Sequence, residues 1–361
     1  MVKKVKFSGM WQGFVPPQYI FVNRQFKCVA LDPPDFNPGS WIGAGKAIFD
    51  HDREQFLLTA RPRKAEGKAR GFAANIYRSN DGEKFELVTS IDKEEISGKS
   101  SLSIHSIEGT QLLKDPFSGK WHFYLSIDTG SDFVWGGLYW QTLLLTAPHV
   151  EGPWQSEGLV LEISELYDSN QARDATIDIV DGRWLCLYKA VDGNRQERPA
   201  LATSSDGISW KKHGILTIEG TDQLAFLSGT IFAGTNGPLF MGLETKLENS
   251  RSVRDDVMYA DEYKIGHGGG PPSNFVAYNL DYRNMNLERI FCAPWKPKSR
   301  YEHGEHPLLG YASLVYDPHK NRVLTYVEAI DGTLTEQIGL NKTVERLLMY
   351  ETLLWKVIVV R

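Results

Sequence analysis

The sequence predicts an all-β protein, in the form of a single five-bladed β-propeller of four-stranded antiparallel blades. Long amphipathic helical patterns are missing from the 361 residues, and short runs rich in aromatic and β-branched residues recur instead. These runs end at Asp-Gly, Asn-Gly or Asp-Pro turns, so each segment reads as a strand, a polar turn and a second strand. We expect residues 1–361 to form one domain, because all-β chains of this length often fold as a single unit.

Five segments of this kind align with one another. Their turns fall at Asp50, Asp115, Asp181, Asn236 and Asp317, at spacings of 55 to 81 residues. Each interval has room for one four-stranded blade and a variable loop. Radial repetition of a hairpin-rich unit leaves only short, protected sheet edges, which favours a propeller. A β-sandwich is the alternative, but it does not explain five similar pairs of strands.

Further hairpins supply the outer strands. Residues 76–88 and 201–214 each contain Ser-x-Asp-Gly-x-x-aromatic, in which glycine permits a tight turn and the aromatic side chain is expected to pack between outer strands. Residues 152–160 look like the corresponding hairpin of the second blade. The terminal runs 19–31 and 349–361 are expected to pair and close the ring.

Composition excludes several classes of protein. The net charge of -5 argues against extensive contact with nucleic acid, which is driven by basic surfaces. No apolar run is long enough for a membrane-spanning helix, and the N-terminus lacks the apolar core of a signal peptide, so we expect a cytoplasmic protein. The three cysteines Cys28, Cys186 and Cys292 lie far apart and read as small buried hydrophobes.

A resemblance to a known group emerges from the repeat. Asp-Gly-Arg-Trp at 181–184, a strand that ends near Tyr188 and SSDGISW at 204–210 together resemble the five-bladed propeller glycoside hydrolases. That group includes arabinanases, β-xylosidases, invertases and levanases, and the tripeptide GPW at 152–154 is frequent in it. The resemblance covers most of residues 41–340 and lies in the order of strands and turn motifs within each repeat. It implies an axial pocket where the innermost strands begin, with two or three carboxylates.

Three acids stand at or before the predicted starts of innermost strands, namely Glu108, Asp174 and Asp222. Cleavage of a glycoside needs one carboxyl group that protonates the leaving oxygen and another that activates water or attacks the anomeric carbon. Glu108 is the predicted general acid and Asp174 its partner, either as base or as the group that orients and tunes the acid. The pair Arg173-Asp174 resembles the Arg-Asp pair of invertase-like enzymes, which have a glutamate near the place of Asp222.

The first blade departs from this pattern. The families place an aspartate at the start of that blade, whereas residues 41–47 read WIGAGKA. Asp32 and Asp35 precede this stretch and are alternative sources of an acid. Arabinanase-like enzymes also have an aspartate where this chain has Glu108. The stereochemistry therefore stays open: about 5 Å between the carboxyls indicates a retaining enzyme, and more than about 6.5 Å an inverting one.

Basic and aromatic side chains near the predicted mouth are candidates for substrate binding. Arg61 and Arg63 follow the second strand of blade one, and Arg173 adjoins Asp174. Guanidinium groups bind carboxylate or phosphate bidentately, so these residues are expected to recognise an acidic sugar or, in a phosphorylase, phosphate. Trp41 and Trp135 offer rings on which a sugar can stack, with core packing as the alternative.

Histidines add a metal hypothesis. His303, Glu305 and His306 lie in EHGEH, whose spacing suits a metal, although Pro307 excludes the helical zinc motif. Arabinanase-like enzymes have a fifth-blade histidine on the axis near an ion, so the resemblance implies His306 beside a structural calcium ion, with no cofactor required for the chemistry. Glu305 and His105 are further candidates for substrate contact.

Three functions follow as hypotheses. The first is a glycoside hydrolase that acts on a terminal or short-chain glycoside, with an oligosaccharide or glycoside as its partner. The second is a glycoside phosphorylase of the same architecture, and the third is a non-catalytic carbohydrate-binding propeller. A sialidase is disfavoured, because its repeat has an extra residue between Asp and Gly and usually six blades. The oligomeric state stays open.

Overall fold

The computed structural model describes residues 15–65, 70–130, 139–234, 237–248, 251–252, 273–305, 307–336, 338 and 342–354. Within these ranges most regular structure is β-strand, and only two short helices occur, α1 (Pro17–Asn23) and α2 (Lys93–Ser100). The all-β prediction is therefore confirmed. Neither helix is long and apolar enough to span a membrane.

Successive antiparallel pairing arranges most of these strands in five groups of four. The first two groups are β3 (Ala47–Asp50), β4 (Gln55–Arg63), β5 (Ala73–Ser79) and β6 (Glu86–Asp92), then β7 (Ser106–Lys114), β8 (Trp121–Asp128), β9 (Trp140–Ala147) and β10 (Gln155–Leu161). The next two are β11 (Gln171–Val180), β12 (Arg183–Val191), β13 (Glu197–Ser204) and β14 (Trp210–Ile215), then β16 (Ala225–Gly234), β17 (Gly237–Glu248), β19 (Asn274–Asp281) and β20 (Asn286–Pro294). The fifth group is β21 (Leu309–Asp317), β22 (Arg322–Ile330), β23 (Glu345–Leu353) and β1 (Gln25–Leu31).

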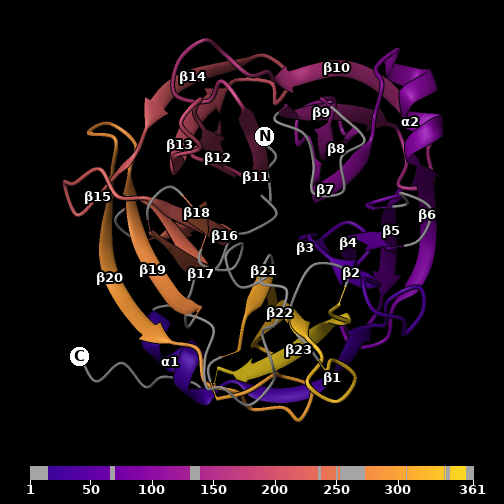
Figure 1. Cartoon of the computed structure of the whole chain (residues 1–361), viewed down its shortest axis with the longest axis vertical. Coiled ribbons are helices and arrows are strands. Elements are labelled where there is room, and N and C mark those ends of the chain that lie inside the picture. Colours follow the sequence, from indigo (N-terminus) through magenta and orange to yellow (C-terminus); the bar gives the residue numbers. More distant parts are fainter. Residues whose placement is uncertain are drawn as a thin grey trace, which may run out of the picture.

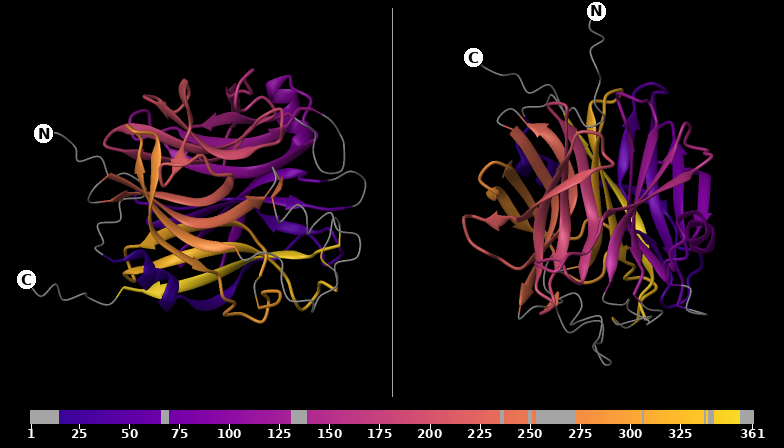
Figure 2. Two further views of the ribbon diagram at one scale, coloured as in Figure 1. Left: turned by 60° about the vertical axis from the view of Figure 1, so that its left-hand side comes forward. Right: turned by 90° about the horizontal axis from the view of Figure 1, so that it is seen from above.

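The groups surround a common centre. Viewed down the shortest axis, β3, β7, β11, β16 and β21 lie nearest the centre, and β6, β10, β14, β20 and β1 lie at the periphery (Figure 1). The first strands of neighbouring groups contact one another, and β21 contacts β3. Figure 2 shows from two further directions that the strands of the groups are twisted. Apolar side chains between the sheets form the core, with the largest cluster running through the first three groups.

Hydrogen bonds between groups are few. Short parallel bridges merge the first and fifth groups, through β2 (Trp41–Gly43), into a sheet of nine strands, and the second and third groups into a sheet of eight. The fourth group stays separate and, with β15 (Thr217–Ile218) and β18 (Arg251–Ser252), makes a sheet of six strands. The groups are therefore held together mainly by side chains, and no continuous ladder encircles the axis in the described part of the chain.

The two ends of the chain meet as predicted, with one difference. β1 pairs antiparallel with β23, from Gln25 opposite Glu351 to Leu31 opposite Leu347. Residues 19–23, which were expected to be the start of this strand, lie in α1 instead. Proline is favoured in the first helical turn, where its ring pre-sets φ and no amide hydrogen is needed. The helix buries Ile20 and Phe21, and residues 355–361 of the predicted closing run lie outside the described part.

The Ser-x-Asp-Gly hairpins dock on the second strand of a neighbouring group. The hydroxyl of Tyr326 on β22 donates to the carbonyl oxygen of Gly82 at 2.7 Å, and that of Tyr124 on β8 donates to the carbonyl oxygen of Gly207 at 2.6 Å. Both glycines have positive φ, and an added Cβ at Gly82 would lie 2.3 Å from Leu324. The repeated motif thus fixes a turn and also supplies an inter-group contact.

The aromatic side chains of the same hairpins, which were predicted to pack between outer strands, pack against the second strand of a neighbouring group instead. Phe85 packs edge-on against Tyr326 with ring centroids 5.8 Å apart, and Trp210 packs against Tyr124 at 6.2 Å. Edge-to-face pairs in this range are favourable beyond their buried area.

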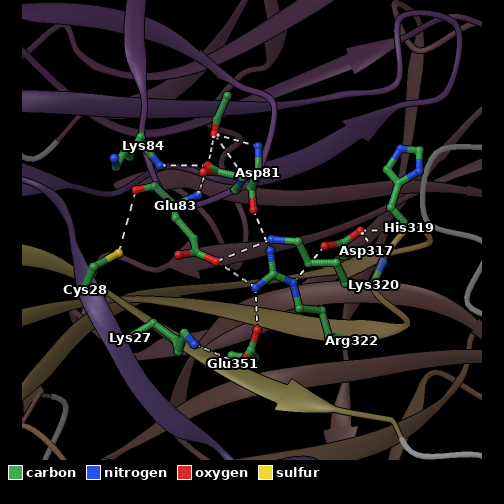
Figure 3. Close-up of polar contacts among 12 residues, drawn as sticks. Lys27, Cys28, Asp81, Glu83, Lys84, Asp317, His319, Lys320, Arg322 and Glu351 are labelled. Carbon is green, nitrogen blue, oxygen red and sulfur yellow. Dashed lines mark hydrogen bonds and ion pairs between the residues drawn. The ribbon is translucent and has the colours of Figure 1, made fainter.

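Arg322 closes the seam between the fifth and first groups (Figure 3). Its side chain is 1% exposed, and its Nε lies 2.7 Å from Asp317 Oδ2. Nη1 lies 2.9 Å from Glu83 Oε1 and also contacts Glu351, while Nη2 donates to the carbonyl oxygen of Asp81 at 2.6 Å. One buried guanidinium therefore joins three carboxylates and a carbonyl group from both sides of the seam.

We expect Arg322→Gln to lower the free energy of unfolding by about 3–5 kcal/mol, because buried carboxylates lose their counter-charge. Lys320→Gln is the matched control: its side chain is 51% exposed and lies 3.7 Å from Glu83, so its loss should cost less than about 1 kcal/mol. Urea denaturation of both variants measures the difference. Equal losses would show that the Arg322 network does not stabilise the seam.

Candidate active site

Irregularities in three first strands bring their side chains together at one end of the axis. The pairing register shifts between Ile107 and Thr110 on β7, between Arg173 and Thr176 on β11, and between Leu309 and Ala312 on β21. Bulges of this kind bend a strand and redirect side chains, often next to active sites.

The redirected residues are Glu108, Asp174 and Tyr311. Asp174 has a φ of +54°, which few non-glycine residues adopt. Its backbone amide donates to the Ser126 hydroxyl at 2.8 Å, which holds this strained position. Glu108 and Asp174 were both predicted to stand where innermost strands begin. The structure brings their two bulges into contact, through the amide of Gly109 and the carboxylate of Asp174.

Asp174 is the most enclosed of these groups, with a side chain that is 1% exposed. Its Oδ1 accepts from the amide of Gly109 at 3.3 Å, and its Oδ2 accepts from the Tyr311 hydroxyl at 3.2 Å. The side-chain nitrogens of Arg173 and Lys189 each lie 3.5 Å from Oδ2. Burial by itself would raise the pKa of Asp174, but the positive charges of Arg173 and Lys189 outweigh it and lower that pKa.

The approach of β7 to Asp174 depends on a glycine. A Cβ added at Gly109 would lie 2.6 Å from Asp174 Oδ1, so a larger residue there would push the carboxylate away.

Glu108 is more accessible, since 13% of its side chain is exposed. Its Oε2 lies 2.6 Å from Arg61 Nη2, and the same nitrogen lies 3.5 Å from Glu328 Oε1. Burial by itself would lower the pKa of Arg61, but the charges of Glu108 and Glu328 raise it above its usual value. Two nitrogens of Arg61, Nε and Nη1, are buried without a hydrogen-bond partner.

Glu328 is a third carboxylate that the sequence analysis did not identify. It lies on β22 of the fifth group and is 1% exposed. Its Oε2 accepts from the amide of Ala44 at 3.0 Å. A Cβ added at Gly43 would lie 2.6 Å from Glu328 Cδ, so this carboxylate fills the space beside the acid-free start of the first group.

Cations and aromatic rings surround the three carboxylates. The Arg173 guanidinium lies 4.4 Å from the centroid of Trp140, and the Lys189 ammonium lies 3.3 Å from Glu197 Oε1. Arg63 stacks over Trp41 at 4.0 Å and donates to a carbonyl oxygen of the chain. Predicted substrate-binding side chains thus lie near the acids, but Arg61, Arg63 and Trp41 are almost fully buried.

Other predicted residues are not brought to the acids. Asp222 is 61% exposed and forms an ion pair with Arg198 at 3.0 Å, because it lies in the loop before β16 and not on the strand. The imidazole of His105 lies 3.4 Å from the Ser103 hydroxyl, and Glu305 is exposed. His306 and Trp135 lie outside the described residues.

The residues that sequence reasoning missed share a signal. Lys189 and Glu328 are ionisable groups near the ends of second strands that are otherwise buried and largely apolar. The second strand of each group runs antiparallel to the first, so its end lies beside the start of the first strand. An alignment of the second strands, made as for the first, would have identified these positions.

The arrangement holds two carboxylates in contrasting environments. Asp174 is enclosed and kept ionised by neighbouring cations, whereas Glu108 keeps partial access to solvent and has one oxygen bound by Arg61. Pairs of carboxyl groups in contrasting environments are what acid–base cleavage of a glycoside requires.

Comparisons with known proteins identify the fold. No protein-family model and no curated protein matches the chain in sequence. Solved structures do match: an N-acetylgalactosamine deacetylase from F. plautii in complex with blood group B trisaccharide aligns with a TM-score of 0.61 and 10% identity, over 91% of this chain and 94% of that chain. The Bombyx mori GH32 β-fructofuranosidase BmSUC1 aligns with a TM-score of 0.58 and 12% identity, over 92% of this chain and 64% of that one.

A member of the GH130 family of mannoside phosphorylases, which contains glycoside hydrolases that target β-1,2-mannosidic linkages in Candida mannan, aligns with a TM-score of 0.53 and 12% identity, over 97% and 95% of the two chains. The resemblance to propeller glycoside hydrolases is thereby confirmed as a likeness of fold. Identities this low do not transfer an activity.

The ionised state of Asp174 predicts a pH dependence. A carboxyl whose folded pKa is lowered contributes stability above its unfolded pKa of about 3.9 and loses it as the pH falls through the folded value. We expect Asp174→Asn to cost about 3 kcal/mol of unfolding free energy between pH 5 and 7, and the difference from the wild type to shrink below pH 4. Denaturant unfolding across this range measures it.

Asp222→Asn is the control, because the exposed Asp222–Arg198 pair should contribute less than about 1 kcal/mol. A difference between wild type and Asp174→Asn that stays constant down to pH 3 would contradict the assigned charge state.

Proposed function

We propose that this protein is a glycoside hydrolase that cleaves a terminal or short-chain glycoside in a pocket at the Glu108–Asp174 end of the axis. The observation that carries the proposal is the pair of carboxylates on adjoining bulges, one buried among cations and one partly exposed. Structural neighbours that act on or bind oligosaccharides support a glycoside as the substrate.

The five strand groups are the blades of one propeller in this proposal, with residues 1–361 as a single domain. The arrangement of β3, β7, β11, β16 and β21 around the centre supports it. A cytoplasmic location, with an imported oligosaccharide as substrate, remains part of the same hypothesis.

Glu108 exchanges the proton with the substrate. Its carboxyl group is the most exposed of the three, and Arg61 holds one oxygen so that the other can face the leaving group. As the glycosidic C–O bond breaks, Glu108 gives its proton to the leaving oxygen, and a water molecule adds to the anomeric carbon. That water gives one proton to bulk solvent, and Glu108 takes a proton back from solvent, so that the step balances and the acid is restored.

Asp174 acts as a fixed negative charge. Its Oδ2 is bound by Tyr311, Arg173 and Lys189 and its Oδ1 by the amide of Gly109, contacts that favour the charged form over a protonated one. A carboxylate in this position stabilises the positive charge that develops on the sugar ring in the transition state. It also orients the Tyr311 hydroxyl toward the same end of the axis.

A glycoside phosphorylase is the second candidate. The unpartnered Nε and Nη1 of Arg61 favour it, because a buried guanidinium edge suits an anion. Against it, Arg61 is 1% exposed and already bound to two carboxylates. The hydrolase therefore has the stronger support.

Glu108→Gln should reduce kcat on alkyl glycosides by about 100-fold or more, because the leaving oxygen loses its proton donor. The loss should be much smaller on 2,4-dinitrophenyl glycosides, whose leaving group departs without a proton. A panel of furanosides, pyranosides and uronides, assayed with and without inorganic phosphate, measures both effects. Glu157→Gln, on the exposed face of β10, is the matched control and should keep wild-type rates.

The other outcomes separate the alternatives. Turnover only with phosphate would establish the phosphorylase. Sugar binding that survives in Glu108→Gln, without turnover by either protein on the whole panel, would establish a binding module. Equal losses on both leaving groups would show that Glu108 is not the proton donor.

A further inference from the structure

Lys46 places a positive charge inside the ring of first strands. The residue directly precedes β3 and is 6% exposed. Its ammonium donates to the carbonyl oxygen of Gly229 on β16 at 2.7 Å and to that of Ala312 on β21 at 3.1 Å. A single side chain from the first group therefore bonds to the first strands of the fourth and fifth groups.

The backbone of this segment is fixed as firmly as its side chain. The amide of Lys46 donates to the Thr59 hydroxyl at 3.0 Å, and its carbonyl oxygen accepts from the Thr59 amide at 3.0 Å. An added Cβ at Gly45 would lie 1.7 Å from the carbonyl oxygen of Thr59, so the chain here approaches β4 as closely as glycine permits. The ammonium is therefore held at a defined place.

Lys46 also borders a cavity enclosed by the first strands. It lines this cavity of about 40 Å³ with residues from all five first strands, among them Gln111, Asp178, Thr230 and Leu314. Burial lowers the pKa of Lys46 to about 7, and the negative charge of Asp174 opposes that shift. Lys46 therefore borders the cavity and also interacts electrostatically with the acid of the candidate site.

The calcium ion that the resemblance implies does not fit the described part of the axis. Calcium takes six to eight oxygen ligands, with carboxylates among them. The described residues contain no group of three or more His, Cys, Asp or Glu side chains that could hold a metal. The two carbonyl groups that face the axis here, at Gly229 and Ala312, already accept from an ammonium ion.

We propose that the Lys46 ammonium is the built-in axial cation of this protein: it ties the first, fourth and fifth groups together and holds a positive charge near Asp174. It is a positioning residue and touches no substrate. The tie between strands does not rest on the proposed function, whereas any effect on turnover does.

Chemical rescue tests this directly in the full-length protein. Lys46→Ala removes three carbons and the ammonium, which n-propylammonium contains. We expect this variant to lose about 5 °C or more in Tm, and n-propylammonium to restore at least half of the loss. Neutral 1-propanol and sodium chloride of equal ionic strength should restore little.

Lys46→Met is the matched control, since it keeps the length of the side chain and leaves no space for the amine. Its Tm should fall and should not respond to n-propylammonium. If Lys46→Ala does not fold, Lys46→Met carries the test. A Lys46→Met variant as stable as the wild type would overturn the proposal, as would equal rescue by 1-propanol. A wild-type Tm that falls with EDTA and recovers with calcium would also overturn it.

The electrostatic interaction between Lys46 and Asp174 is tested separately, by comparing the Tm of two single variants with that of the double variant. In the wild type, Asp174→Asn removes a charge that faces Lys46, whereas in Lys46→Met that interaction is already gone. The Tm loss of the double variant should therefore be smaller than the sum of the single losses, and additive losses would contradict the link. If the protein hydrolyses glycosides, n-propylammonium should also raise kcat of Lys46→Ala with little change in KM. Rescue of Tm without any turnover would leave the axial cation established and count against the proposed function alone.

Discussion

The carboxylate of Asp174 is the charge around which the candidate site is arranged. Its partners come from separate parts of the fold: Gly109 from the second group, Arg173 and Lys189 from the third, and Tyr311 from the fifth. These contacts exist only while the first strands stay close together at this end. An ionised carboxylate buried among cations is stable only as a complete set, because the loss of any partner leaves an uncompensated charge. The site and the central packing therefore depend on each other.

Side chains, and not backbone ladders, hold the groups in place. The groups share only short hydrogen-bonded bridges, so buried polar residues carry the connections at both ends of the strands. Arg322 joins the last group to the first at the seam, and the Tyr326 hydroxyl caps the turn at Gly82 across the same boundary. The acids come from different groups and are neutralised differently: Glu108 is paired with Arg61 of the first group, whereas Asp174 is paired with Arg173 and Lys189 of its own group.

Much of the fold could be predicted, because the relevant signals are local. A polar turn between two apolar runs and the Ser-x-Asp-Gly hairpins depend on a few adjacent residues, and the structure has strands on both sides of these turns wherever it is described. Glu108 and Asp174 were identified because charge is unusual at the start of an apolar strand. Asp222 shows the limit of that reasoning. Asp222 has the same charge as Glu108 and Asp174 and a similar position in the repeat. It stands three residues before the first residue of β16, however, and therefore lies in an exposed loop beside Arg198.

By itself, the sequence determined the strand-rich repeat, the hairpin turns and two of the carboxylates. Only the tertiary structure decided how they are combined. Three contacts join residues that are far apart in the chain. They are the approach of the Gly109 bulge to Asp174, the entry of Glu328 beside Gly43, and the passage of Lys46 to the carbonyls of Gly229 and Ala312. Such contacts depend on how neighbouring sheets pack, and no local pattern encodes that packing. An acid of the fifth group therefore lies beside the acid-free start of the first group, which only the assembled ring reveals.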